Sequence, residues 1–140
     1  MKKKMKYLKS IKKIIIDKDD KLHEECGVFG IYNHSDAAAL TALGLHALQH
    51  RGQEASGIVT FDGKKFISER HSGLVSDNFT KESVIRRLVG NSAVGHNRYS
   101  TTGATIKRNI QPFFADLWGG GFAIAHNGNC LLYTSDAADD

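Results

Sequence analysis

Several features that would point to a membrane, secreted or low-complexity protein are missing from this sequence. Its 140 residues include only one proline, two cysteines and one tryptophan. No apolar run approaches the roughly 18 residues of a membrane span. The apolar cluster from Ile14 to Ile16 is too short for the core of a signal peptide, and no small-residue cleavage site follows it. These absences favour a cytoplasmic protein that does not contact a membrane.

The cysteine count and the hydrophobic content narrow the class further. Cys26 and Cys130 could form a single disulfide, but a lone reactive thiol in a reducing compartment fits better. Hydrophobic residues make up 41% of the chain, which is enough for a core. A length of 140 residues corresponds to one domain or part of one.

The net charge of +4 comes entirely from the first 25 residues. That segment holds nine lysines and five acidic residues, whereas the remainder holds ten basic and ten acidic residues. Lysine clusters without interleaved aromatic residues are more often solvated tails than nucleic-acid binding sites. We therefore expect no nucleic-acid partner, and we interpret residues 1–25 as a leader that is too charged to pack well.

The first half of the remaining chain alternates between strand and helix patterns. An apolar run over residues 27–32 predicts a buried strand. A helix is expected next, capped by Ser35 or Asp36 and running to about Gln49. Residues 58–61 and 66–70 then read as paired strands around Asp62-Gly63, a strong hairpin signal.

The second half predicts one more helix and two more strands. Asn78 or Thr80 can cap a helix through Leu88, and residues 93–98 and 122–126 read as strands that each end in a polar motif. The pattern as a whole predicts a mixed α and β domain with its candidate catalytic residues at strand ends.

Residues 130–140 do not continue this pattern. They resemble the conceptual translation of a sequencing adapter, and the alternative is a genuine polar C-terminus. We expect a leader over 1–25, a truncated domain over 26–129 and a non-native tail over 130–140. On this reading the isolated chain should be inactive and poorly folded.

Cys26 stands at the head of the first predicted strand, just after the charged leader. Removal of the leader would make it the N-terminal residue, and its own α-amino group, which titrates near ~7.7–8.0, could then serve as the base for the thiol. The alternative is that Cys26 is a structural cysteine buried in a strand, which is the more common role of a cysteine there. Taken alone, Cys26 would favour that alternative.

Four further residues offer what attack on an amide carbonyl requires. Asn127 and Gly128 follow a strand and can present a side-chain amide and a main-chain N–H to an oxyanion, although a plain Asn-Gly turn is the common alternative. Arg98 ends a strand and can bind a carboxylate through its planar fork, or it is simply a surface arginine. Thr101 can add a hydroxyl contact.

The combination of motifs is more specific than any single one. The chain resembles the glutaminase domain of the amidophosphoribosyltransferases, a family of class II glutamine amidotransferases, over residues 26–129. The motifs that carry this resemblance occur in order: Cys-Gly-Val-Phe-Gly (26–30), His-Arg-Gly-Gln-Glu-Ala-Ser-Gly (50–57), Gly-His-Asn-Arg-Tyr-Ser-Thr (95–101), Asn-Ile-Gln-Pro (109–112) and His-Asn-Gly-Asn (126–129).

The resemblance implies a fold and a set of roles. The fold would be the α+β N-terminal-nucleophile (Ntn) hydrolase sandwich, with four layers in the order αββα and incomplete in this chain. The nucleophile would be Cys26, exposed by loss of a propeptide, and Asn127 with Gly128 would form the oxyanion hole. The glutamine would be held by the remaining matched residues: Arg98, Thr101, Arg51 and Gly52.

The resemblance also implies parts that this sequence does not contain. A phosphoribosyltransferase domain with its Mg²⁺ site would follow, together with an acidic residue that binds the glutamine α-amino group. Some members that carry a propeptide also bind a [4Fe-4S] cluster through downstream cysteines. No cofactor or metal is expected within these 140 residues. Glutamine, phosphoribosyl diphosphate and further copies of the full-length chain are the implied partners.

Other class II amidotransferases fit the motifs less well. Glucosamine-phosphate synthase is expected to show Arg-Gly-Tyr-Asp where this chain has Arg-Gly-Gln-Glu (51–54), and glutamate synthase lacks Gln-Glu-Ala-Ser-Gly (53–57). A non-catalytic module with the same fold is a further alternative, but the intact set of site residues argues against it. A binding protein acting through its basic leader is disfavoured by the neutral body of the chain.

Overall fold

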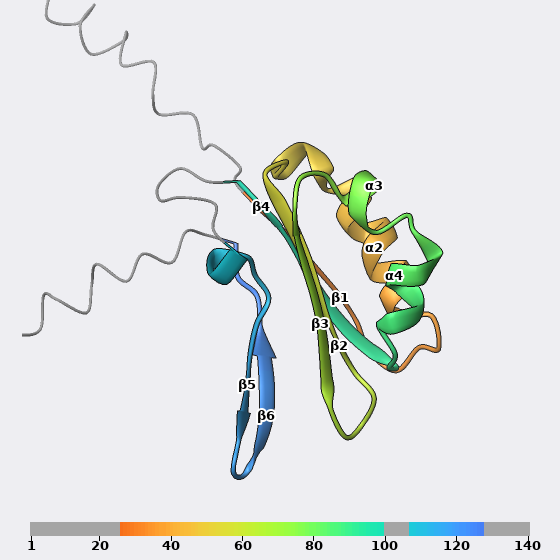
Figure 1. Cartoon of the computed structure of the whole chain (residues 1–140), viewed down its shortest axis with the longest axis vertical. Helices are drawn as coiled ribbons and strands as arrows, with labels where there is room; N and C mark the ends of the chain where they lie inside the picture. Colours follow the sequence, from red (N-terminus) through yellow and green to blue (C-terminus); the bar gives the residue numbers. More distant parts are fainter. Residues whose placement is uncertain (1–25, 100–106, 128–140) are drawn as a thin grey trace, which may run out of the picture.

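The computed structural model describes residues 26–99 and 107–127. In this part of the chain, one layer of helices and two antiparallel sheets lie in succession (Figure 1). Sheet A has the strand order β1-β4-β2-β3, and sheet B is a two-stranded hairpin. The strands are β1 Gly27–Ile31, β2 Ala55–Phe61, β3 Phe66–Ser72, β4 Ser92–Arg98, β5 Phe113–Leu117 and β6 Gly120–Ile124. The helices are α2 Ala37–Ala47, α3 Val75–Asn78 and α4 Glu82–Arg87, with short 3-10 turns η1 Gln49–Arg51 and η2 Lys107–Asn109.

The three α-helices cover one face of sheet A (Figure 1). Successive side chains of a strand point to opposite faces, so every second residue of β2 and β4 reaches this helical layer. Leu45 from α2 and Ile58 from β2 are fully buried there, with Phe79 and Leu88 around them. This cluster is the main apolar core of the described residues, and none of their helices is long and apolar enough to cross a membrane.

The hairpin of sheet B lies on the opposite face of sheet A (Figure 1). Phe66 of β3 connects the two sheets, because its ring stacks on Phe61 at 4.7 Å and on Phe114 at 6.3 Å between centroids. An apolar cleft of about 260 Å³ remains between the sheets, lined among others by Ile31, Val94 and Ala123. This cleft lies at the far end of β1 from Cys26.

Most of the predicted elements are confirmed. The strands predicted over 27–32, 58–61, 66–70 and 93–98 correspond to β1 to β4, with shifts of one to three residues at their ends. The Asp62-Gly63 turn is also confirmed, since Gly63 has φ +94° and the Asp62 carboxylate accepts hydrogen bonds from the amides of Lys64 and Lys65 at 2.8 and 2.9 Å.

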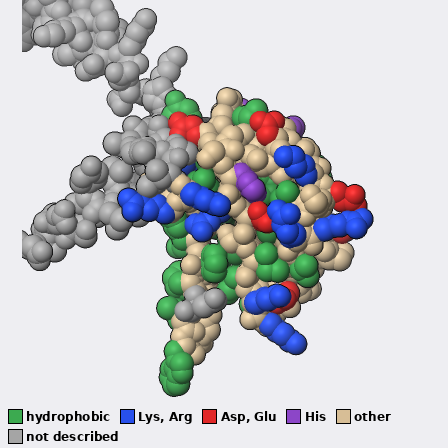
Figure 2. Space-filling view, viewed as in Figure 1, with side chains coloured by type: hydrophobic (Ala, Val, Ile, Leu, Met, Phe, Trp, Pro, Cys, Tyr) green, Lys and Arg blue, Asp and Glu red, His purple; other side chains and the backbone are tan. Residues whose placement is uncertain are grey.

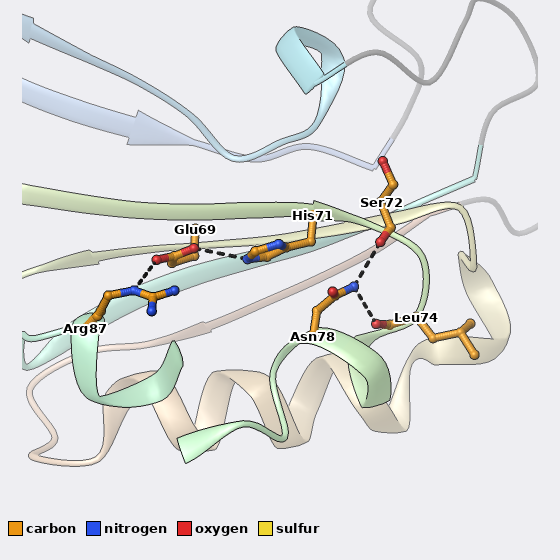
Figure 3. A network of polar contacts seen from close by, with 6 residues as sticks. All are labelled: Glu69, His71, Ser72, Leu74, Asn78 and Arg87. Carbon is orange, nitrogen blue, oxygen red and sulfur yellow. Dashed lines mark hydrogen bonds and ion pairs between the residues drawn. The ribbon is translucent and has the colours of Figure 1, made fainter. Parts of the chain in front are cut away.

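The helix predicted through Leu88 is confirmed by α4, but its proposed caps are wrong, because Lys81 occupies the N-cap and no side chain caps it. A separate short helix, α3, precedes it, and Asn78 ends α3 instead of capping α4. The Asn78 amide donates to the carbonyls of Ser72 and Leu74 at 2.9 and 3.0 Å (Figure 3). The Thr80 hydroxyl donates to the Ser76 carbonyl at 2.6 Å. Both side chains thus donate to carbonyls of preceding residues and neither caps α4.

Two details of the other elements also differ from the prediction. Asp36 occupies the N-cap of α2 but makes no side-chain capping bond, and α2 ends at Ala47 before the 3-10 turn η1. The strand predicted over 122–126 instead runs from Gly120 to Ile124, where it pairs with β5, which the prediction missed. The pattern Phe-Phe-Ala-Asp-Leu before Trp-Gly-Gly (113–120) was the available signal for this hairpin.

Candidate active site

Cys26 lies where the start of β1 meets the turn η1. Its main-chain N–H donates to the Arg51 carbonyl at 3.0 Å, and the Arg51 guanidinium Nε donates back to the Cys26 carbonyl at 2.7 Å. Cys26 also has φ +64°, in the left-handed region that residues other than glycine rarely adopt. Two reciprocal hydrogen bonds therefore hold this residue in an uncommon backbone conformation.

The Cys26 thiol is directed toward the C-terminal end of β4. Its Sγ atom lies 3.5 Å from both the amide nitrogen and the carbonyl oxygen of Tyr99, and the residue is 2% exposed. This burial agrees with both interpretations of the cysteine, catalytic and structural. The position of Cys26 tells more about its role than its burial does, because the residue lies where the start of β1, the turn η1 and the residue after β4 meet.

The His-Arg-Gly motif packs directly against the end of β4. A Cβ atom built on Gly52 would lie 2.7 Å from the Arg98 carbonyl carbon and 2.9 Å from that of Asn97. Two residues later, the Glu54 amide donates to the Arg98 carbonyl at 3.2 Å. Glycine at position 52 is thus required by the close approach of two backbones, which brings Arg51 and Arg98 to the same end of sheet A.

Arg98 is only 6% exposed, so the alternative interpretation of this residue as a surface arginine is wrong. The side chain lies on the face of β4 toward sheet B, where Nη1 donates to the Asn109 carbonyl at 2.9 Å. Asn109 ends the turn η2, so the guanidinium connects β4 to the segment that leads into sheet B. Its role in binding a substrate carboxylate stays a prediction.

Asn127 is exposed and follows the end of β6. The residue before it, His126, donates its main-chain N–H to Oε1 of Gln111 at 2.8 Å. No hydrogen bond joins Asn127 to Cys26 within residues 26–99 and 107–127. Thr101 and Gly128 lie outside the described residues, so the structure brings together four of the seven predicted site residues: Cys26, Arg51, Gly52 and Arg98.

Two buried polar residues near this site were quoted in motifs but assigned no role. His96 is fully buried two residues before Arg98, and burial lowers its pKa to about 4. The backbone of His126 raises the pKa of His96 in part, whereas the charges of His126 and Arg98 lower it further. Gln111 is 2% exposed. The available signal was the pair of motifs Gly-His-Asn-Arg and Asn-Ile-Gln-Pro, each of which places a polar side chain beside a predicted site residue.

In the described part of the chain, no group of three or more His, Cys, Asp or Glu side chains is arranged to hold a metal ion. The geometry offers a sulfur atom 3.5 Å from the Tyr99 amide, with the Arg51 guanidinium bonded to the carbonyl of the same cysteine and Arg98 at the adjoining end of β4. Such a site can attack a carbonyl carbon and bind an anionic substrate.

Comparison with known proteins agrees with this arrangement. The family model described as class II glutamine amidotransferases matches residues 26–139, and the chain belongs to this family. Two curated relatives are similar over most of this chain. A protein named amidophosphoribosyltransferase from Rhizobium etli is 68% identical over 110 residues, which are 79% of this chain and 22% of the relative. Amidophosphoribosyltransferase 3, chloroplastic, from Arabidopsis thaliana is 53% identical over 118 residues, or 84% of this chain and 22% of the relative.

Solved structures give the same result. A glutamine phosphoribosylpyrophosphate amidotransferase from B. subtilis, complexed with ADP and GMP, matches with a TM-score of 0.62 and 39% identity, covering 70% of this chain and 21% of that one. A structure described as the allosteric regulatory enzyme of purine biosynthesis matches with a TM-score of 0.63 and 40% identity, covering 69% and 21%. The Ntn fold class expected from the motifs is therefore confirmed. The chain spans about a fifth of the length of the relatives it matches.

Proposed function

We propose that this chain is the glutamine-hydrolysing part of an amidophosphoribosyltransferase. The full-length enzyme would transfer the amide nitrogen of glutamine to phosphoribosyl diphosphate, giving 5-phosphoribosylamine, glutamate and diphosphate. The observation that carries the proposal is the place of Cys26 at the start of β1, bonded to Arg51 and in contact with the end of β4 beside Arg98. The similarity to proteins named amidophosphoribosyltransferase supports the choice of acceptor.

The chemistry proceeds in two steps. In the first, Cys26 Sγ forms a bond to the amide carbon of glutamine while the α-amino group takes the thiol proton. The C–N bond then breaks, and ammonia leaves with that proton. In the second step, water attacks the thioester carbon and gives a proton to the α-amino group, the S–C bond breaks as that proton passes to the sulfur, and glutamate is released. Asn127 and Gly128 stabilise the oxyanion in both steps, and Arg98 and Thr101 hold the substrate carboxylate.

This scheme requires the leader to be removed between Glu25 and Cys26. An acylated nitrogen cannot act as a base, whereas a free α-amino group at this position would lie 3.0 Å from the Arg51 carbonyl oxygen, which can accept a hydrogen bond from it. Cleavage would also remove the constraint on φ of Cys26, because that angle is defined by the preceding carbonyl carbon. A strained residue of this kind costs about 1–3 kcal/mol while the leader is attached.

The remaining parts of the proposal concern the full-length protein. A phosphoribosyltransferase domain would follow the glutaminase domain and supply the Mg²⁺ site, and any [4Fe-4S] cluster would be held by downstream cysteines. The enzyme would be a cytoplasmic homo-oligomer. Ammonia released at Cys26 would be consumed in that second domain, so free ammonia should replace glutamine as the nitrogen donor.

The test uses the full-length product of the gene that carries this sequence. We expect its mature form to begin at Cys26 by intact mass, and the wild type to release glutamate. Cys26→Ala should abolish glutamate release and glutamine-dependent product formation, while ammonia-dependent formation of phosphoribosylamine survives. Glutaminase activity in Cys26→Ala, or an active enzyme that retains residues 1–25, would contradict the proposal. A wild type with neither activity would favour the non-catalytic module.

A further inference from the structure

Residues 109–112, which we call the crossing segment, run across the face of sheet A that points toward sheet B. The Asn109 carbonyl accepts a hydrogen bond from Arg98 of β4 at 2.9 Å, and the Ile110 carbonyl accepts one from Arg70 of β3 at 3.4 Å. Ile110 is fully buried. The segment is thus fastened at successive residues to two strands of the sheet.

The next residue, Gln111, rests on the inner strand β2. Its carbonyl oxygen occupies the space above Gly57, where any Cβ atom would clash with it. Gly57 pairs with His96 of β4, so Gln111 sits beside the buried histidine. The side chain of Gln111 therefore has little freedom, because its own backbone is in contact with the sheet and the residue is 2% exposed.

The Gln111 side chain holds the segment that carries Asn127. Its Oε1 atom accepts the His126 amide at 2.8 Å, and only the carbonyl end of a carboxamide can accept from an N–H group. His126 lies beyond the end of β6, so its amide has left the strand ladder. A partly buried amide that has left the ladder needs another acceptor, and Gln111 is the residue that satisfies this donor and sets the backbone before Asn127.

We propose that Gln111 is a positioning residue for the oxyanion hole. Through the crossing segment, it fixes the position of the Asn127 backbone relative to Arg98. The distance between Asn127, which stabilises the oxyanion, and Arg98, which binds the substrate carboxylate, is thereby kept constant. The inference rests on the proposed function, in which Asn127 donates to the oxyanion. Oxyanion donors act only within a few tenths of an ångström of their ideal distance, and loss of one costs about 10²–10³ in kcat.

The experiment compares variants of the full-length enzyme. Gln111→Met keeps most of the side-chain volume but removes the acceptor, and we expect kcat for glutamine hydrolysis to fall about 10- to 100-fold with KM changed less than about threefold. Gln111→Glu keeps an acceptor oxygen and should retain more activity. The matched control is Asn78→Leu, which removes side-chain amide bonds to main chain on the helical side of sheet A (Figure 3) and should leave kcat unchanged.

A double-mutant cycle with Asn127→Ala separates positioning from a general loss of structure. Asn127→Ala alone should lower kcat about 10²–10³-fold, and Gln111→Met should then cause little further loss. Suppose that Asn127→Ala lowers kcat as expected. The inference is then overturned if Gln111→Met leaves kcat unchanged or raises only KM. It is also overturned if the loss of kcat in the double variant equals the product of the two single losses. If Gln111→Met does not fold, Gln111→Asn, which withdraws the acceptor by one carbon, must show the same loss of kcat. Full activity in Asn127→Ala would instead contradict the proposed oxyanion hole.

Discussion

Gly52 shows how little space the candidate site leaves between its elements. Its backbone is extended, with φ −166°, so any residue could adopt the conformation, yet a Cβ atom would lie 2.7 Å from the Arg98 carbonyl carbon. The constraint is therefore steric, and it is set by a residue 46 positions away in the sequence. A side chain here would push η1 away from the end of β4 and separate Arg51 from Arg98.

We expect Gly52→Ala in the full-length enzyme to lower stability by about 1–3 kcal/mol, as overpacking does. It should also reduce kcat/KM for glutamine more than ammonia-dependent activity. Gly30→Ala is the matched control, because its Cβ atom would make an ordinary contact of 3.5 Å with the Ala93 carbonyl. Thermal unfolding and parallel assays with the two nitrogen donors check this. Equal effects of the two substitutions would contradict the steric argument.

His96 makes the stability of the domain sensitive to acid. Burial lowers its pKa to about 4 from an ordinary value of 6.5, so the unfolded state binds a proton more readily than the folded state below pH 6.5. His96 has no effect on stability above that pH and destabilises the folded state as the pH falls toward 4. One pKa unit corresponds to about 1.4 kcal/mol, so the loss is about 2 kcal/mol at pH 5 and about 3 kcal/mol at pH 4.

His96→Gln should remove this part of the acid sensitivity. Its thermal midpoint should fall less between pH 7.5 and pH 5 than that of the wild type, even if the variant is less stable at pH 7.5. His46→Gln, at an exposed position of α2, should keep the wild-type dependence on pH. Identical pH dependence in His96→Gln and the wild type would show that His96 does not titrate in this way.

At the scale of elements, an ionic network joins β3 to α4. Glu69 accepts a hydrogen bond from Arg87 at 2.8 Å and contacts His71 at 3.0 Å (Figure 3). The hydrogen bond from Arg87 lowers the pKa of Glu69 below its ordinary value of 4.5, and His71 adds a smaller effect. The network thus stabilises the folded state above pH 4.5, and this contribution is lost as the pH falls through the lowered pKa.

We expect Glu69→Gln to lower the thermal midpoint at pH 7, with the difference from the wild type shrinking as the pH falls below 4.5. Glu82→Gln is the control, because Glu82 is a carboxylate on α4, the helix that carries Arg87. Glu82 pairs with Arg86, but both side chains are at least 75% exposed, and such pairs contribute little. Thermal unfolding over pH 3–8 separates the two cases. A Glu69→Gln difference that does not change with pH would contradict the role of the carboxylate charge.

At the scale of the whole molecule, the described residues leave an apolar face on sheet B uncovered. Phe114 stacks on Phe66 of sheet A, and strand alternation therefore turns its neighbours in the hairpin away from sheet A. Phe122 and Ile124 point outward in this way and are 50% and 51% exposed. Figure 2 shows hydrophobic side chains along the projecting hairpin, whereas charged side chains of both signs are scattered over the rest of the visible face.

The αββα fold of the family provides a reason for this face, because a second helical layer would cover it. We expect residues 26–140 expressed alone to be poorly soluble, since exposed apolar patches promote aggregation. Phe122→Ser with Ile124→Ser should raise the soluble yield of that fragment and lower the stability of the full-length protein. Phe114→Ser, on the inner face of sheet B, should raise the soluble yield of neither the fragment nor the full-length protein. A soluble, active wild-type fragment would contradict this view of the uncovered face.

Local signals in the sequence were sufficient for the strands β1 to β4, the Asp62-Gly63 turn and the family. These features depend on alternation, turn residues and ordered motifs, all of which lie within a few neighbouring residues. The caps of α4 were predicted wrongly because the Asn78 and Thr80 side chains donate to carbonyls of preceding residues, and the short helix α3 was missed. The hairpin partner β5 was missed because its short apolar run gave no clear alternation.

Only the tertiary structure decided what meets at the site. The strand order β1-β4-β2-β3 places Cys26 beside Tyr99, and no local pattern specifies which strands are neighbours. The contacts of Gln111 with the backbones of Gly57 and His126 join three segments that are distant in the sequence. The sequence alone determined which chemical groups the protein carries and the order in which they occur. Long-range pairing and packing determined which of those groups lie close enough to act together.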